Sequence, residues 1–234
     1  MSVYLSLVKR VQPPKRYEGY SQELLLLLGE ELKQPLVAIS QLAELQAEAG
    51  LDVSAHASRA LKTIDNITFY HRLNSGQMSL KLEPIHVGST IQEVARSMEP
   101  IMRSAGCRTE LVIQHGLSPV TADRRLLISA LQSLWQGFLG TMPSGSYIEC
   151  RARRTPTGVR LSLHGRNALL NEVKFSNTNY SSTQPITGLA GSSADIITAR
   201  GMFALLGAEL SKSSSKQVAG LGATLQISRQ LQMV

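Results

Sequence analysis

The sequence predicts an α+β protein in which an N-terminal helical hairpin precedes a two-layer sandwich, with helices covering one face of a sheet. Two stretches in the first third of the chain have the apolar spacing of amphipathic helices. The composition changes after "LNSGQ" at 73–77. Beyond that point, segments that alternate like strands are interspersed with segments of helical periodicity, which is typical of a sheet covered by helices.

The first 80 residues predict the hairpin. From Ser21 to about Ala49, apolar residues recur at three- and four-residue spacing on one helical stripe, formed by Leu25, Leu28, Leu32, Leu36, Ile39 and Ala43. After Gly50, a second helix is expected to run to about Asn74, with an apolar face formed by Ala57, Leu61, Ile64 and Thr68. A hairpin alone leaves half of its apolar surface in water, so we expect two copies to pair as a four-helix bundle.

The rest of the chain predicts strands and helices in mixed order. Strands are expected at "SLKLEPIHV" (79–87), "TELVIQHG" (109–116), "YIECRAR" (147–153), "GVRLSLHG" (158–165) and "GATLQISRQL" (222–231). Helices are expected over 89–105, 124–140 and 194–206, and a long polar loop over 167–193. These elements together predict the helix-on-sheet sandwich.

Composition excludes several classes of protein. The longest apolar run near the start, 24–28, is too short to span a membrane. The short apolar patch before Lys9 has no small-residue cleavage pattern after it, so we expect no secretory signal and a cytoplasmic protein. The net charge is +7, yet the basic residues are scattered without a docking helix beside them, which argues against nucleic-acid binding. Cys107 and Cys150 lack partners at metal spacing, so we expect buried thiols and no metal site.

Three stretches resemble the transmitter portion of sensor histidine kinases. "GEELKQPLVAI" at 29–39 is similar to the phosphoacceptor box S-H-E-L-R-T-P-L, and "YHRLNSGQMSLKLEPIHV" at 70–87 to the end of the second bundle helix. The later order of elements, from "ADRRLLISALQSLW" to "GATLQIS", follows the ATPase domain of that family. The resemblance implies an N-terminal arm (1–20), a dimerisation and phosphoacceptor-like hairpin (21–80) and a histidine-kinase ATPase-like domain of the GHKL type (81–234).

The acceptor box has lost its histidine. In register with the family, the acceptor position falls on Glu30, and a carboxylate cannot form the phosphoramidate that makes histidine a phosphate carrier. The neighbouring acid, which acts as a general base in the family, is present as Glu31 but has no acceptor to deprotonate. Pro35 is retained and predicts a bend in this helix. We therefore expect no catalytic residue here.

The nucleotide motifs are degenerate as well. The resemblance places Ser133 and Gly137 at the asparagine positions that serve Mg²⁺, and Leu163 at the aspartate that reads adenine. In the same box Gly165 survives, whereas Asn167 replaces the second glycine.

A second glycine box normally cradles phosphates at a helix N-terminus. Here "GLAGSSADI" at 188–196 keeps Gly188 and Gly191 with altered spacing, so an anion could still bind there. The combined losses put ATP and Mg²⁺ binding in doubt, and we expect no cofactor.

The preferred hypothesis is therefore a pseudokinase, meaning a homodimeric, histidine-kinase-like signalling protein that acts by protein binding. Its expected partner is a response-regulator receiver domain or another kinase. The alternative is an active atypical histidine kinase or ATPase with relocated residues, for which His71 would be the first candidate acceptor. Two other interpretations stay open at this point, an unrelated α+β protein with a helical hairpin and nucleic-acid binding through the basic surface.

Overall fold

The computed structural model describes residues 53–139, 142–166, 193–212 and 220–228, of which 53–58 and 193 are described without their side chains. It also describes Glu31, Leu32, Pro35, Ala38 and Ile39 of a helical N-terminal segment. Its helices are α2 (Val53–Asn74), α3 (Val87–Ser104), α4 (Arg124–Leu139) and α5 (Ser193–Leu205). Its strands are β1 (Glu83–Ile85), β2 (Arg108–Ile113), β3 (Val120–Ala122), β4 (Tyr147–Thr155), β5 (Gly158–Arg166), β6 (Ser211–Lys212) and β7 (Gly220–Leu225).

A five-stranded sheet forms one layer of the molecule. Its strand order is β2-β4-β5-β7-β6, with β2 parallel to β4 and every other pair antiparallel. A small second sheet pairs β1 with β3, and a bridge between Val120 and Ile227 joins it to the end of β7. Among the described strands, β2 and β6 are therefore the edges of the large sheet.

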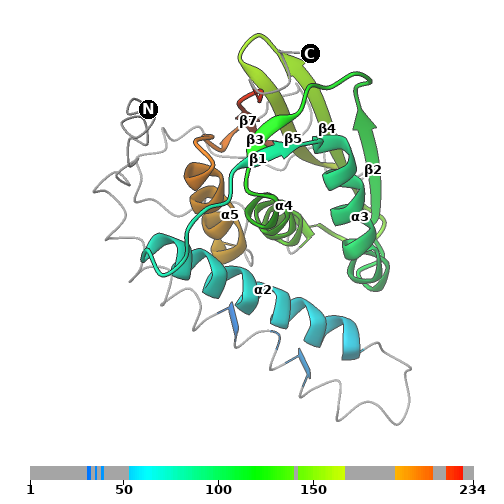
Figure 1. Cartoon of the computed structure of the whole chain (residues 1–234). Helices are drawn as coiled ribbons and strands as arrows, with labels where there is room; N and C mark the ends of the chain where they lie inside the picture. Colours follow the sequence, from blue (N-terminus) through cyan, green and yellow to red (C-terminus); the bar gives the residue numbers. More distant parts are fainter. Residues whose placement is uncertain are drawn as a thin grey trace, which may run out of the picture.

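Helices α3, α4 and α5 form the second layer and cover one face of the sheet (Figure 1). Side chains alternate along the strands, so every second residue of β4 and β5 points toward these helices. Ile148, Cys150, Leu161 and Leu163 are buried on that face against α4 residues such as Trp135. The expected α+β sandwich is confirmed, and both cysteines are buried free thiols as predicted.

Helix α2 packs along the outside of the helical layer (Figure 1). Its Ile67, Phe69, Tyr70 and Leu73 are buried in the same apolar cluster as the core of the sandwich. The face identified from the sequence is the other one, because Leu61 and Ile64 are 61% and 38% exposed. The helix thus has two apolar faces, and the sequence pattern detected only the face that points away from the sandwich.

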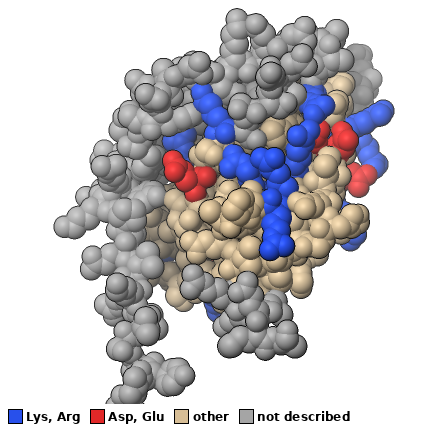
Figure 2. Space-filling view, turned by 90° about the horizontal axis from the view of Figure 1, so that it is seen from above, with Lys and Arg blue, Asp and Glu red and all other residues tan. Residues whose placement is uncertain are grey.

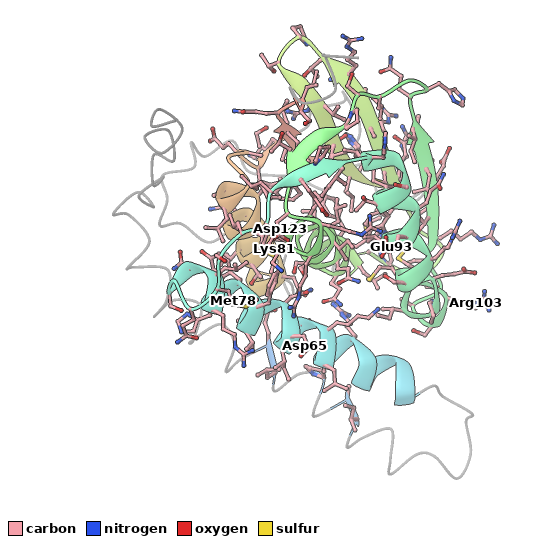
Figure 3. All side chains as sticks on the ribbon, in the orientation of Figure 1. Asp65, Met78, Lys81, Glu93, Arg103 and Asp123 are labelled. Atoms are coloured by element: carbon pink, nitrogen blue, oxygen red, sulfur yellow. The ribbon has the colours of Figure 1, made fainter. Side chains whose placement is uncertain are left out.

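Two connections hold the helical layer in register. Gly106 follows α3 with φ +64°, a conformation that disfavours side chains, and a Cβ there would also collide with Ser144. Asp123 caps α4 by accepting a hydrogen bond from Leu126 N at 2.9 Å, and its other oxygen accepts one from Lys81 N at 2.8 Å. Figure 3 shows Asp123 and Lys81 side by side, where the segment after α2 reaches the start of α4.

The strand expected over 79–87 is only the short β1, and β3 and β6 are additional short strands. Residues 79–82 alternate in sequence but make no ladder in the structure. The described α2 confirms the second helix of the expected hairpin up to Asn74. The predicted domain boundary near residue 80 stays a prediction.

Candidate functional site

The expected site residues fall into two groups. The structure describes the side chains of Glu31, Pro35, Ser133, Leu163 and the backbone of Gly137 and Gly165. Glu30, Asn167, Gly188 and Gly191 lie outside the described residues. Of these, Glu31 lies at the N-terminal end of α5, and Gly137 of α4 lies beside Ile196 of α5, whereas Leu163 and Gly165 lie on β5.

The start of α5 is occupied by a carboxylate from the N-terminal segment. Ala194 N donates a hydrogen bond to Glu31 Oε1 at 2.9 Å, although the two residues are 163 positions apart in the chain. The first amides of a helix lack partners within the helix and carry partial positive charge, so they favour a negative group. Glu31 therefore supplies, from within the chain, the anion that this helix end would otherwise attract.

A second acid, Asp195, lies in the first turn of α5 and is buried. Thr63 Oγ1 of α2 lies 3.3 Å from Asp195 Oδ1 and 2.9 Å from Gln136 Oε1 of α4. Arg59 donates to the backbone oxygen of Gln136 at 3.5 Å. We call this set the α5 cluster: Glu31, Arg59, Thr63, Gln136 and Asp195. It joins the N-terminal segment, α2, α4 and α5 at one point.

The α5 cluster makes Asp195 a weak acid. The pKa of Asp195 is raised from its ordinary 3.8 to about 7, chiefly by burial; Arg59 lowers the pKa and the nearby Glu31 carboxylate raises it. The carboxyl therefore changes its protonation near neutral pH. No residue of this cluster except Glu31 was identified from the sequence.

The α4 positions expected to serve Mg²⁺ are filled by packing. A Cβ built on Gly137 would overlap the side chain of Ile196 from α5, so glycine at this position lets Ile196 pack closely against α4. Ser133 is buried, and its Oγ has no hydrogen-bond partner in the described part of the chain. At these two positions the resemblance leads us to expect asparagine carboxamides, whose oxygens are hard ligands for Mg²⁺, whereas the chain has a hydroxyl and a glycine.

Leu163 of β5, which the resemblance places at the aspartate that reads adenine, also lies in an apolar environment. Leu163 is fully buried in the core cluster and pairs across the ladder with Cys150 and Leu221. Beside it, a Cβ on Gly165 would lie 2.7 Å from Met142 Sδ and 3.3 Å from Phe138 Cδ1. Side chains thus occupy the space next to the surviving glycine.

Helix α2 contacts the sandwich beyond the α5 cluster. Lys62 Nζ donates to the backbone oxygen of Ser97 in α3 at 2.9 Å. The Arg125 guanidinium of α4 lies 4.3 Å from the centre of the Phe69 ring. A Cβ on Gly201 of α5 would overlap the Tyr70 ring. The α5 cluster is thereby held within a tightly packed interface.

The outer face of the sheet gathers basic residues that are separate in the sequence. The register of β4 and β5 places Arg153 opposite Arg160, and Figure 2 shows Lys and Arg side chains forming a band across this end of the described surface. Arg151 and Arg166 both pair with the buried Glu149, the latter at 3.0 Å. The fold thus brings together arginines that are separate in the sequence, while the expectation that the chain does not bind nucleic acid stays a prediction.

Two of the described histidines, His71 and His164, lie in different environments. His71 is exposed in the last turn of α2. His164 is buried on β5, its Nε2 lies 3.0 Å from Ser162 Oγ, and burial together with the charge of Arg151 lowers its pKa. Within the described ranges, no group of three or more His, Cys, Asp or Glu residues could hold a metal ion. Nor does any helix in them have the length and apolar character to cross a membrane.

The chain has the fold of a histidine kinase transmitter. No protein-family model and no curated protein matches it, so the assignment rests on solved structures. The histidine kinase AdeS of Acinetobacter baumannii is 14% identical with a TM-score of 0.54, covering 84% of this chain and 97% of that one. A histidine kinase from Burkholderia phymatum is 12% identical with a TM-score of 0.51, covering 86% and 98%. Full-length ShkA in complex with AMPPNP is 16% identical with a TM-score of 0.53, covering 88% and 46%.

Sequence reasoning missed most of the α5 cluster because its members are far apart in the chain; Thr63 and Asp195, for example, are 132 positions apart. Thr63 and Gln136 are polar residues within helices, and nothing local distinguishes them from surface residues. Asp195 carried the one available signal, since it is the acid in the first turn of a helix that follows a glycine-rich segment.

Proposed function

We propose that this chain is a histidine-kinase-like signalling protein that does not transfer phosphate and acts as a homodimer by binding other proteins. Its expected partner is a receiver domain or another kinase. The transmitter fold alone does not assign an activity, whereas the α5 cluster and its surroundings limit what the chain can bind.

The observation that carries the proposal is the Glu31 carboxylate on Ala194 N at the start of α5. In the resemblance, this helix end belongs to the phosphate-cradling glycine box. A nucleotide phosphate entering here would meet Glu31 and, above neutral pH, the ionised Asp195. Like charges in a buried setting repel strongly, so the cluster opposes a polyphosphate.

The remaining described positions fit ATP and Mg²⁺ poorly. Leu163 cannot accept a hydrogen bond from the adenine amino group, and Met142 and Phe138 occupy the space beside Gly165. At the metal positions, Ile196 fills the space beside Gly137. These contacts support a domain that serves as a scaffold and does not use a nucleotide for catalysis.

The exposed face of α2 supports the homodimer. Leu61 and Ile64 lie one turn apart and are exposed, with Thr68 on the same face. An apolar stripe on a helix is normally covered by another element. In the proposed dimer, this stripe contributes to a four-helix bundle.

Nucleotide binding by the full chain tests the proposal directly. We expect isothermal titration with ATP to detect no Mg²⁺-dependent binding up to millimolar concentration. We also expect no label on the protein after incubation with [γ-³²P]ATP and Mg²⁺. Label that disappears in His71→Ala would establish the alternative active kinase and refute the proposal.

A gain-of-function variant sharpens this test. Glu30→His restores the side chain that the resemblance places at the acceptor position. If the domain is inactive, this variant stays unlabelled while its circular dichroism matches that of the parent. Labelling of Glu30→His would show that only the acceptor had been lost and that the ATPase-like domain still works.

A further inference from the structure

A cavity of about 770 Å³ lies between α3 and the edge strand β2, away from the α5 cluster. Its apolar lining includes Ala95, Met102, Cys107 and Leu111, and its charged lining includes Arg96 and Arg108. Burial raises the pKa of the Cys107 thiol, which therefore acts here as an apolar surface. We call this feature the α3–β2 groove. Figure 1 shows β2 at the margin of the sheet with α3 beside it.

The strand that forms one wall of the groove has an open edge. Within the described sheet β2 pairs with β4 alone, so its other side offers backbone N–H and C=O groups to a further strand. Leu111 lies opposite Cys150, whose side chain is buried under the helices, and thus points to the helix-covered face. Leu111 is nevertheless 37% exposed, because no described strand lies beyond it. An added strand would cover it.

The polar atoms of the groove also indicate an extended ligand. Thr109 lies opposite the buried Ile148, so it shares the helix-facing side of β2 with Leu111. Its Oγ1 is buried and has no hydrogen-bond partner among the described residues. Thr109 is a lining residue of the cavity, and a peptide backbone or side chain seated there would supply the missing partner.

The charge of the groove selects the kind of ligand. Glu99 is engaged by Arg103 within α3 at 2.6 Å, and Figure 3 shows Arg103 at the far end of this helix. Arg96 and Arg108 are exposed, and no ion pair is formed by either within the described structure. Three arginines thus line the groove against one glutamate. This arrangement complements carboxylates on a partner.

We propose that the α3–β2 groove binds an extended acidic and apolar segment of a partner protein, added alongside β2 as a sixth strand. Main-chain hydrogen bonds to β2 would supply affinity, as in other strand-addition complexes. An apolar side chain of the segment would enter the cavity at Leu111 and Met102, and carboxylates would meet Arg96 and Arg108. This surface goes beyond the proposed function and does not depend on whether the chain transfers phosphate.

Display selection provides the test because random peptides can be screened while the partner protein is still unidentified. Random decapeptides are selected against the full chain, and the enriched peptides are measured by fluorescence anisotropy. We expect them to alternate carboxylates with apolar residues and to slow hydrogen exchange of the β2 amides. Leu111→Lys and the double variant Arg96→Glu/Arg108→Glu should each weaken binding by roughly tenfold or more.

Two controls separate the groove from general effects. Leu82→Lys introduces the same charge at an exposed apolar residue outside the groove and should leave affinity unchanged. Peptides with lysine in place of their acids should bind the double variant better than the parent chain. Circular dichroism of each variant establishes that it is folded.

Several outcomes would overturn the proposal. No enriched peptide, enriched peptides without acids, or equal binding to parent and groove variants would each remove the acidic-segment assignment. Light scattering that shows a dimer of the parent and a monomer of Leu111→Lys would assign the groove to a second copy of the chain. Exchange protection outside β2 and α3 would place the peptide on a different surface.

Discussion

Replacing Asp195 by asparagine should change how the stability of the protein depends on pH. The folded chain holds the Asp195 proton up to a pKa of about 7, whereas the unfolded chain releases it near 3.8. Between these values the folded state binds more protons, so the free energy of unfolding falls as pH rises and levels off above the folded pKa. A pKa difference of three units corresponds to a change of at most roughly 4 kcal/mol in the free energy of unfolding. The amide of the Asp195→Asn variant stays neutral, so in this variant the contribution of residue 195 to stability would not depend on pH.

The measurement is urea unfolding followed by the fluorescence of Trp135, the single tryptophan, which is buried beside the sheet. Midpoints are compared at pH 5, 6, 7 and 8 for the parent and for Asp195→Asn. Asp65→Asn removes a carboxylate from the exposed face of α2 and serves as the matched control.

We expect Asp195→Asn to gain stability relative to the parent as pH rises, whereas Asp65→Asn follows the parent. Other groups titrate in both proteins, so the difference between the two curves isolates Asp195. If the difference stays flat from pH 5 to 8, Asp195 ionises normally in the folded chain. The description of Asp195 as a weak acid within the α5 cluster would then be wrong.

Three further predictions concern packing and exposure. Leu61→Lys should convert the proposed dimer to monomers in light scattering without loss of helicity. A dimer that is unchanged in this variant would show that the exposed apolar face of α2 is not the dimer interface. Gly201→Ala should lower the free energy of unfolding by about 1–3 kcal/mol in urea titrations, because the added Cβ overlaps the Tyr70 ring. If Gly201→Ala destabilises a Tyr70→Ala background as much as the parent, the overlap with Tyr70 is not the cause. Cys107 and Cys150 should resist a thiol reagent at pH 8 until urea is added, since burial raises both thiol pKa values, and rapid native labelling would contradict their burial.

The helices and long strands could be predicted because their periodicity is local. The segment expected over 124–140 is α4, Arg124–Leu139, and that over 194–206 is α5, Ser193–Leu205. The two- and three-residue strands β6 and β3 were missed because so few residues carry no periodic signal. Their pairing is decided by neighbours distant in sequence.

The loss of the nucleotide motifs stays a prediction made from residue types and the resemblance. For Leu163 and Gly137 the structure shows only that core side chains surround them. That Glu31 would accept a hydrogen bond from Ala194 could not be predicted, because this contact depends on how the N-terminal segment meets α5. Which apolar face of α2 packs on the sandwich could not be predicted either, since both faces have helical spacing and only tertiary packing distinguishes them.

The packing of α2 also limits how this protein can be divided. A chain beginning at residue 81 would lack Ile67, Phe69, Tyr70 and Leu73, which complete the core over α3, α4 and α5. Exposing such a surface invites aggregation, so a shortened version that keeps α2 should be far easier to purify than one that begins after it. The same dependence restricts recombination during evolution, because a crossover near residue 80 would have to supply a matching helix.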